Sequence, residues 1–265
     1  MTNYGWGLPI AASTYAGKID FGIWLIHAVM IAIFVLWGIF FTYLLIRYRK
    51  RPGVPAVRDA DDHSSLAGEI KALTPDFIVM GLEIALIVFY ALPGWSSIKM
   101  HMPDEKDAVV IHVVAEQFGW DIHYAGPDGK FGRRKPELVH FNNPLGLDRT
   151  DPDAADDIVV GNEIHMPVNK KILIKLTSKD VIHDFFVPEF RIKQDAMPGM
   201  EIPVWVEPNR VGHYELACAQ LCGFGHSLMR GDVYVESQED YDKWLASRAA
   251  AAPAPAKPSN PAEDF

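Results

Sequence analysis

Cysteine is scarce in this chain, with only two among 265 residues. One disulfide is therefore the most that the chain can form. The sequence also has no Cys-x-x-Cys-His segment, which excludes a haem attached through that motif.

Basic residues are fewer than acidic ones: the chain has 25 lysines and arginines and 34 acidic residues, which gives a formal net charge of −9. The two signs balance over residues 1–95, so the whole excess lies in residues 96–265. An acidic surface argues against nucleic acid as a partner and would attract basic proteins in a salt-dependent way. Alternatively, the acidic faces are simply solvated.

The two cysteines share one short segment, Cys218–Met229, with a histidine and a methionine at Cys-x3-Cys-x3-His-x2-Met spacing. Thiolate and thioether are soft donors that suit copper. A blue-copper site needs one thiolate, so a second cysteine indicates two sulfurs that bridge two copper ions. Such a pair shares one electron and acts as an electron relay.

Two other interpretations of the cysteines remain open. They could form a structural or redox-active disulfide, or belong to a thioredoxin-type copper chaperone. Neither alternative uses the nearby His226 and Met229, so we favour the relay.

Two long apolar runs precede this region. Residues 21–46 carry no charge and would span about 39 Å as a helix, more than the roughly 30 Å of a bilayer core. Residues 77–95, interrupted only by Glu83, are just long enough to cross as well. A signal peptide would be shorter and begin with basic residues. We therefore predict a transmembrane hairpin over residues 21–95.

Basic residues predict how the hairpin is oriented. Four of the five residues from Arg47 to Arg51 are basic, which places the loop 47–76 in the cytoplasm. The tail 1–20 and everything after Trp95 then lie outside, on the periplasmic face of a bacterium.

The remaining chain predicts an all-β domain, an antiparallel sandwich or small barrel. Short β-branched and aromatic runs predict strands at 108–118, 158–160, 171–177, 202–207, 213–217 and 232–236. The Cys218–Met229 segment would join the last two strands. Ser237 would cap a short helix, and the Ala/Pro-rich residues 249–265 are expected to be disordered.

Two motifs resemble subunit II of the haem–copper cytochrome c oxidases. They are Cys-Ala-x-Leu-Cys-Gly-x-Gly-His-x-x-Met at residues 218–229 and Ser-x-Asp-Val-Ile-His at residues 178–183, with the Lys-x-Asp-Ala-x-Pro-Gly that follows. The resemblance implies a cupredoxin-like Greek-key sandwich over residues 96–248 that holds a dinuclear copper A centre.

The family's ligand set transfers by position. The resemblance implies that Cys218 and Cys222 bridge the two coppers and that His183 and His226 bind one each. Met229 and the backbone carbonyl of Gln220 would complete the coordination. The other histidines are expected to be structural; they are His27, His63, His101, His112, His123, His140, His165 and His213.

The sequence departs from the family in the copper loop and in an aromatic stretch. Gln220 replaces a glutamate that reaches a magnesium ion in the family, and an amide binds such an ion more weakly, which puts the magnesium in doubt. Phe118 replaces the tryptophan where electrons arrive from cytochrome c, so Phe118 or Trp120 would serve there. Alternatively, both rings simply pack under the loop.

The family's proton-path glutamate has two candidates here. Asp76 lies at the membrane edge, and Glu83 lies about 10 Å deeper along the helix. A carboxylate inside the membrane is by default a functional hypothesis, and a hydrogen bond to a neighbouring helix is the alternative.

The sequence thus predicts subunit II of an aa3-like oxidase in a bacterial plasma membrane. Cytochrome c would reduce the copper pair, and the electron would pass to a subunit I of the haem a/a3–CuB type, where oxygen becomes water and protons are translocated. Subunit III and the lipid bilayer are further expected partners. The cysteines argue against a quinol oxidase, and no propeller domain of a nitrous oxide reductase is present. A membrane-anchored copper carrier or chaperone is the alternative.

Overall fold

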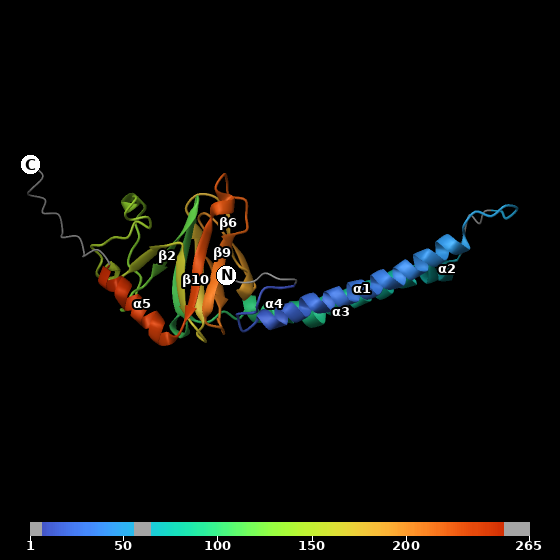
Figure 1. The fold of residues 1–265 in the computed structure, drawn as a ribbon, viewed down its shortest axis with the longest axis horizontal. Coiled ribbons are helices and arrows are strands. Elements are labelled where there is room, and N and C mark those ends of the chain that lie inside the picture. Colours follow the sequence, from blue (N-terminus) through green and yellow to red (C-terminus); the bar gives the residue numbers. More distant parts are fainter. Residues whose placement is uncertain (1–6, 56–64, 252–265) are drawn as a thin grey trace, which may run out of the picture. The chain divides into compact units, whose positions relative to one another are not determined.

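The computed structural model describes residues 7–55 and 65–251. The chain divides into two compact units, one made of residues 18–100 and the other of residues 1–17 with 101–265. The first unit is helical and the second is a β-sandwich (Figure 1).

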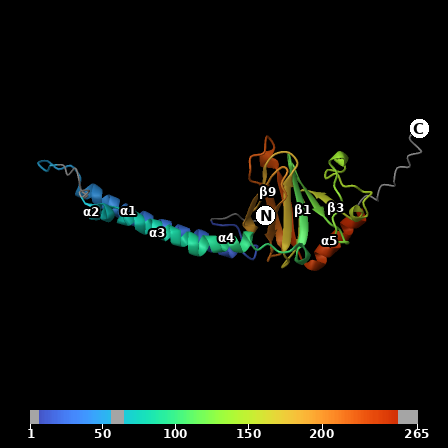
Figure 2. The same cartoon turned by 180° about the vertical axis from the view of Figure 1, so that it is seen from behind.

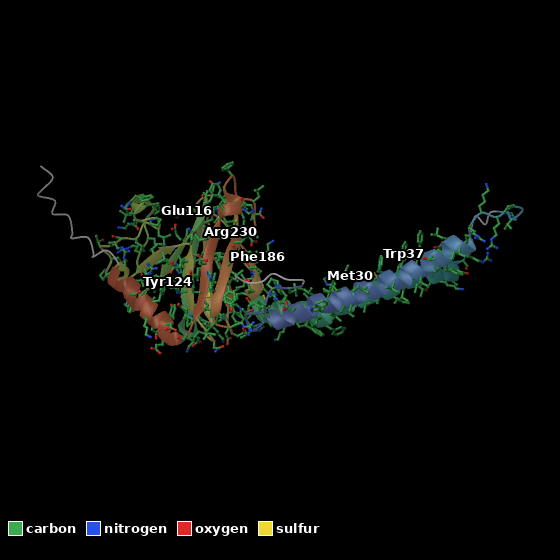
Figure 3. The ribbon with its side chains drawn as sticks, in the orientation of Figure 1. Met30, Trp37, Glu116, Tyr124, Phe186 and Arg230 are labelled. Carbon is green, nitrogen blue, oxygen red and sulfur yellow. The ribbon has the colours of Figure 1, made fainter. Side chains whose placement is uncertain are left out.

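The helical unit contains two helices that are long and apolar enough to cross a membrane. The first is α1 (Ala16–Arg47), whose Met30 and Trp37 side chains are exposed (Figure 3). The second runs from Thr74 to Lys99 as α3 (Thr74–Leu86), the π-helical turn η1 (Ile87–Ala91) and α4 (Leu92–Lys99). The predicted spans 21–46 and 77–95 lie inside these two helices.

The two apolar helices lie side by side (Figures 1 and 2). Tyr90 of η1 connects the two helices. Its hydroxyl donates to the carbonyl of Lys18 at 2.5 Å, and its ring packs against that of Phe21. The connection between the helices holds a further short helix, α2 (Leu66–Ala72), which the sequence did not predict. The side chain of Ser65 caps it by accepting from the backbone N–H of Gly68. Residues 56–64, including His63, lie outside the described residues.

The β unit is a sandwich of two five-stranded sheets, which confirms the predicted fold class. The first has the order β3-β2-β1-β5-β8, with β1 Val109–Glu116, β2 Gly119–Tyr124, β3 Ile158–Gly161, β5 Ile172–Ser178 and β8 Ile202–Val206. The second has the order β4-β10-β9-β6-β7, with β4 Glu163–Pro167, β6 His183–Val187, β7 Ile192–Ala196, β9 Gly212–Cys218 and β10 Arg230–Glu236.

All six predicted strands are present, but four others were missed: β2, β4, β6 and β7. The predicted strand 108–118 ends at Glu116, where the chain turns back into β2. The expectation of a purely antiparallel sandwich was also wrong. The pairs β1–β5 and β4–β10 are parallel, because each joins strands that a long crossover separates in sequence.

The helix after β10 is longer than predicted. Ser237 caps α5 (Gln238–Ala251) by accepting from the backbone N–H of Asp240, as the sequence indicates. The helix continues through residues 249–251, which were assigned to a disordered tail, and residues 252–265 lie outside the described residues.

The connection between β2 and β3 covers the outer face of the first sheet. Phe131 from this connection stacks on His112 of β1 with ring centroids 4.0 Å apart. Asp157 accepts from the Nε2 of His123, on β2, at 2.8 Å. Both ring nitrogens of His112 are buried, and among the described residues neither has a hydrogen-bond partner, so a charged imidazole is costly there.

This covered face makes the stability of the domain depend on pH. Burial lowers the pKa of His112 to about 3, and it also lowers the pKa of His123, although Asp157 opposes the second shift. An unfolded histidine has a pKa of about 6.5. As the pH falls below that value, His112 binds a proton in the unfolded chain but stays neutral in the folded chain, which lowers the free energy of unfolding. The part of the free energy of unfolding that depends on neutral His112 is fully present above pH ~6.5. It is lost progressively as the pH falls toward the pKa of the folded histidine.

We predict that the variant His112→Phe tolerates acid better than the parent chain. Between pH 6.5 and 5 its free energy of unfolding should fall by about 2 kcal/mol less, measured by urea unfolding of the full chain in detergent. His140→Phe, which changes an exposed histidine, serves as the control and should follow the parent. An unchanged pH slope in His112→Phe would contradict this account.

Candidate metal centre

The segment Cys218–Met229 joins β9 to β10 and stands at one end of the sandwich (Figure 1). Its two ends are pinned by the sheet, because Ala217 pairs with Arg230 in the antiparallel ladder. One further backbone hydrogen bond, from the N–H of Cys218 to the carbonyl of Met229, closes the loop at 3.1 Å. The loop therefore starts and ends on donors that the sheet holds side by side.

The donors of the loop converge on its interior. The Sγ atoms of Cys218 and Cys222 lie 3.8 Å apart. Cys222 Sγ is 3.6 Å from His226 Nδ1 and 3.9 Å from Met229 Sδ. The thiol of Cys218 donates to the carbonyl of Gln220 at 3.2 Å. Each predicted donor of the loop thus lies within 4 Å of at least one other.

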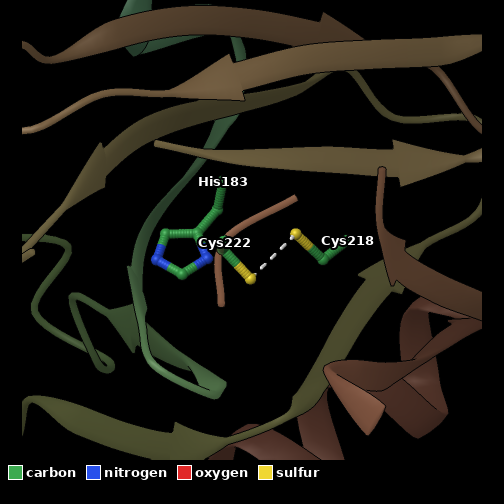
Figure 4. A group of neighbouring side chains, drawn as sticks. All are labelled: His183, Cys218 and Cys222. Carbon is green, nitrogen blue, oxygen red and sulfur yellow. Dashed lines mark hydrogen bonds between the residues drawn. The ribbon is translucent and has the colours of Figure 1, made fainter. Parts of the chain in front are cut away.

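His183 reaches this volume from a different strand. It is the first residue of β6, which pairs with β9 so that Phe185 lies opposite Cys218. Its ring is fully buried, and Nδ1 lies 3.1 Å from Met229 Sδ. Ligand atoms of His183, Cys218 and Cys222 all lie within 4.8 Å of one another (Figure 4).

The cysteines are free thiols in this structure. Their sulfur separation of 3.8 Å is far beyond the roughly 2.0 Å of a disulfide bond. Burial and, to a smaller extent, the adjacent Cys218 thiol together raise the pKa of Cys222 to about 11. A cation bound between the sulfurs would reverse this electrostatic effect and take the place of the thiol protons.

Asp180 orients the imidazole of His183, a role that the sequence did not reveal. His183 Nε2 lies 2.9 Å from Asp180 Oδ1, and a proton on Nε2 leaves the lone pair of Nδ1 directed at the sulfurs. Partial burial raises the pKa of Asp180, but hydrogen bonds from His183, Gln117 and Val181 outweigh it and hold the pKa below its ordinary value. The only signal was the position of Asp180 in the Ser-x-Asp-Val-Ile-His motif.

The two rings proposed to receive electrons occupy different depths. Phe118 lies at the turn between β1 and β2 with 39% of its surface exposed. Trp120 is 1% exposed and packs edge-on against His183, with ring centroids 6.3 Å apart. A soluble partner can contact Phe118 directly, whereas the buried ring of Trp120 is out of reach of such a contact. Their roles stay predictions.

The two candidate proton-path acids belong to the helical unit. Asp76 lies in the first turn of α3, and Glu83 lies two turns further along the same helix. Both side chains are exposed in the isolated chain. Their roles also stay predictions.

The family model for the periplasmic domain of cytochrome c oxidase subunit II matches residues 109–237. An alternative cytochrome c oxidase subunit 2 from Bradyrhizobium diazoefficiens is 33% identical over 241 residues, which cover 91% of this chain and 83% of the relative. The chain belongs to the cytochrome c oxidase subunit II family.

Two further matches cover less of the chain. The cytochrome c oxidase subunit 2 of Thermostichus vulcanus is 43% identical over 104 residues, covering 39% of this chain and 32% of the relative. A solved periplasmic domain of subunit II from Bradyrhizobium japonicum is 26% identical with a TM-score of 0.42, covering 57% of this chain and 99% of that domain.

Membership of the subunit II family has three consequences. Its members are parts of a haem–copper oxidase complex, so the chain works with other subunits. The family normally binds copper, and the two apolar helices and the periplasmic-domain match indicate a membrane-anchored protein with an extramembrane domain.

The residues present fit copper. Two thiols, a thioether and two imidazoles are the donors that copper prefers, and hard cations such as magnesium bind them poorly. Cys218, Cys222, Met229 and His183 are all at least nine-tenths buried. A soft metal would therefore find its ligands already gathered and shielded from water.

We predict that Asp180→Ala weakens metal binding more than it weakens the fold. Removing the carboxylate leaves His183 Nε2 without its acceptor, and the loss of such a supporting contact typically costs about 10- to 100-fold in metal affinity. The free energy of unfolding should fall by about 1–3 kcal/mol. Copper titration and urea unfolding of the full chain measure the two effects.

Asp153, whose side chain is 47% exposed, provides the control, because Asp153→Ala should leave copper affinity unchanged. Equal copper affinity in Asp180→Ala and the parent chain would refute the role assigned to Asp180.

Proposed function

We propose that this chain is the electron-accepting subunit II of an aa3-like cytochrome c oxidase. It would receive electrons from cytochrome c at a dinuclear copper A centre and deliver them to haem in subunit I. Oxygen reduction and proton translocation would take place in the complex, beyond this chain.

The observation that carries this proposal is the convergence of two thiols on one buried volume. Cys218 and Cys222 would hold both coppers between their sulfurs, His183 and His226 would bind one copper each, and Met229 would contribute its thioether. The backbone carbonyl of Gln220 would contribute as well, and its distance of 3.2 Å from Cys218 Sγ supports this. When bound, the copper pair accepts and releases one electron.

The protein's part in this transfer is to keep the ligands still. The sheet register holds Cys218 and Met229, and Asp180 holds the ring of His183. Burial excludes water that would otherwise reorient when the charge of the centre changes. Fixed ligands and a dry site both lower the energy that opposes electron transfer.

Charge and exposed apolar side chains support docking of cytochrome c near the centre. Residues 96–265 carry the whole net charge of −9, which attracts a basic partner. Leu221, Phe224 and Leu228 of the loop are exposed, and the ring of Phe118 lies close to Gly225 of the same loop. Such an apolar patch is typical of a protein contact site. We assign Phe118 as the first residue that a donor meets.

The remaining assignments follow from the sequence and stay part of the proposal. The chain would lie in a bacterial inner membrane with the copper domain on the periplasmic side, beside subunits I and III. Glu83 or Asp76 would admit protons toward subunit I. We expect no magnesium ion at Gln220, since its amide is a weaker ligand than a carboxylate.

We predict that the copper-loaded full chain contains two copper ions per polypeptide. Cys218→Ser and Cys222→Ser should each lose the dinuclear centre, because one remaining sulfur cannot bridge as two do. Metal analysis gives the stoichiometry, and the visible absorption of the copper–thiolate centre reports the loss. Ser227→Ala, in the same loop but without an assigned ligand, should behave as the parent chain.

A single copper per polypeptide in the parent chain would rule out the dinuclear centre. If that chain also purified from its native membrane without a haem protein, the membrane-anchored copper carrier would replace the oxidase subunit as the proposed function.

A further inference from the structure

The turn between β1 and β2 touches the metal loop without supplying a ligand. Gln117 and Phe118 occupy this turn, between the paired residues Glu116 and Gly119. The side-chain amide of Gln117 donates from Nε2 to the carbonyl of Cys222 at 2.6 Å. This hydrogen bond joins the turn to the middle of the loop at Cys222, one of the two cysteines.

The backbone of Gln117 makes a second connection. Its N–H donates to Asp180 Oδ2 at 2.8 Å, while the other oxygen of the same carboxylate lies 2.9 Å from His183 Nε2. Gln117 therefore connects the loop that carries Cys222 with the segment that carries His183. These segments lie far apart in the sequence, and each supplies part of the donor set.

Two glycines allow the loop to lie this close to the turn. A Cβ at Gly223, whose φ is +136°, would be 2.8 Å from Gln117 Nε2. A Cβ at Gly225 would be 2.5 Å from the ring of Phe118. Both distances are too short for a side chain at either position, so the close packing of loop on turn depends on glycine.

We infer that Gln117 is a positioning residue of the metal centre: its amide fixes the backbone at Cys222 and so holds the Cys222 and His226 donors in place. The inference rests on the proposed copper function and deepens it. The printed hydrogen bond of the Gln117 side chain goes to the backbone carbonyl of Cys222 and not to a predicted ligand atom, so the side chain acts through the loop backbone. Its side chain lies at the surface, which means that replacing it leaves the core of the sandwich intact.

Two near-isosteric variants of Gln117 separate the hydrogen bond from charge. Gln117→Met removes the N–H donor without adding charge, and Gln117→Glu removes the donor and adds a negative charge. The matched control is Gln238→Met on α5, where an exposed glutamine also donates through Nε2, to Asp242 at 2.9 Å. All variants are made in the full chain and purified in detergent.

The first measurement needs no metal. Iodoacetamide alkylates the reduced, copper-free chain, and its rate reports how often the loop opens, because Cys222 is only 4% exposed. Loss of one hydrogen bond should speed alkylation about three- to tenfold in both Gln117 variants. Gln238→Met should react at the parent rate, and the thermal unfolding midpoint of the Gln117 variants should fall by only the few degrees that loss of one hydrogen bond explains.

The second measurement uses the chain loaded with cupric ion and challenged with a chelator. Both Gln117 variants should lose copper at chelator concentrations about 10- to 100-fold lower than the parent chain. Their copper–thiolate absorption should also shift, since the sulfur position changes. A residue with a purely structural role would move neither the absorption nor the chelator midpoint.

The inference is overturned if both variants alkylate and retain copper as the parent does. It is also overturned if only Gln117→Glu differs, which would implicate charge, or if Gln238→Met alkylates as fast as the Gln117 variants. A parent chain that binds no copper would defeat the proposed function instead. The alkylation rates would still decide whether Gln117 fixes the loop.

Discussion

A single closed loop between two paired strands governs the metal centre. The ladder of β9 and β10 brings the first and last donors of the loop together. The backbone hydrogen bond from Cys218 to Met229 joins the two ends of the loop. The loop between these points can then turn Cys222 and His226 inward, so that four donors face one volume. Without the pairing of the strands, soft donors at the same spacing would have no reason to converge.

The sandwich adds what a loop alone cannot supply. Pairing of β6 with β9 sets His183 beside the sulfurs, and Trp120 and Phe185 pack around it to exclude water. Asp180 then fixes the orientation of the imidazole. A site built in this way gathers its ligands before a metal arrives, which lowers the cost of binding and keeps the geometry constant during electron transfer.

The sequence predicted the parts of this protein that depend on composition and local spacing. Long uncharged runs revealed both apolar helices, and alternation of β-branched residues revealed the strands that have one buried face. The Cys218–Met229 motif identified the loop donors, since soft ligands at short spacing have few other uses. His183 could be chosen over other histidines only by family resemblance, because its approach depends on strand pairing across the sheet.

Other features depend on tertiary contacts and left no local signal. The strands β4, β6 and β7 contain prolines, charged residues or acids that weaken a strand pattern, yet each pairs with a neighbour that stabilises it. The parallel pairs β1–β5 and β4–β10 arise from long crossovers that no short window contains. Asp180 and Gln117 support the centre through contacts between segments that are remote in sequence, so neither could be identified from residue type.

The central claim is that paired sulfurs join two copper ions into one redox unit. Electron paramagnetic resonance of the copper-loaded full chain tests it most directly. The account predicts hyperfine coupling of one unpaired electron to two equivalent copper nuclei. A spectrum with coupling to a single copper nucleus would contradict the account.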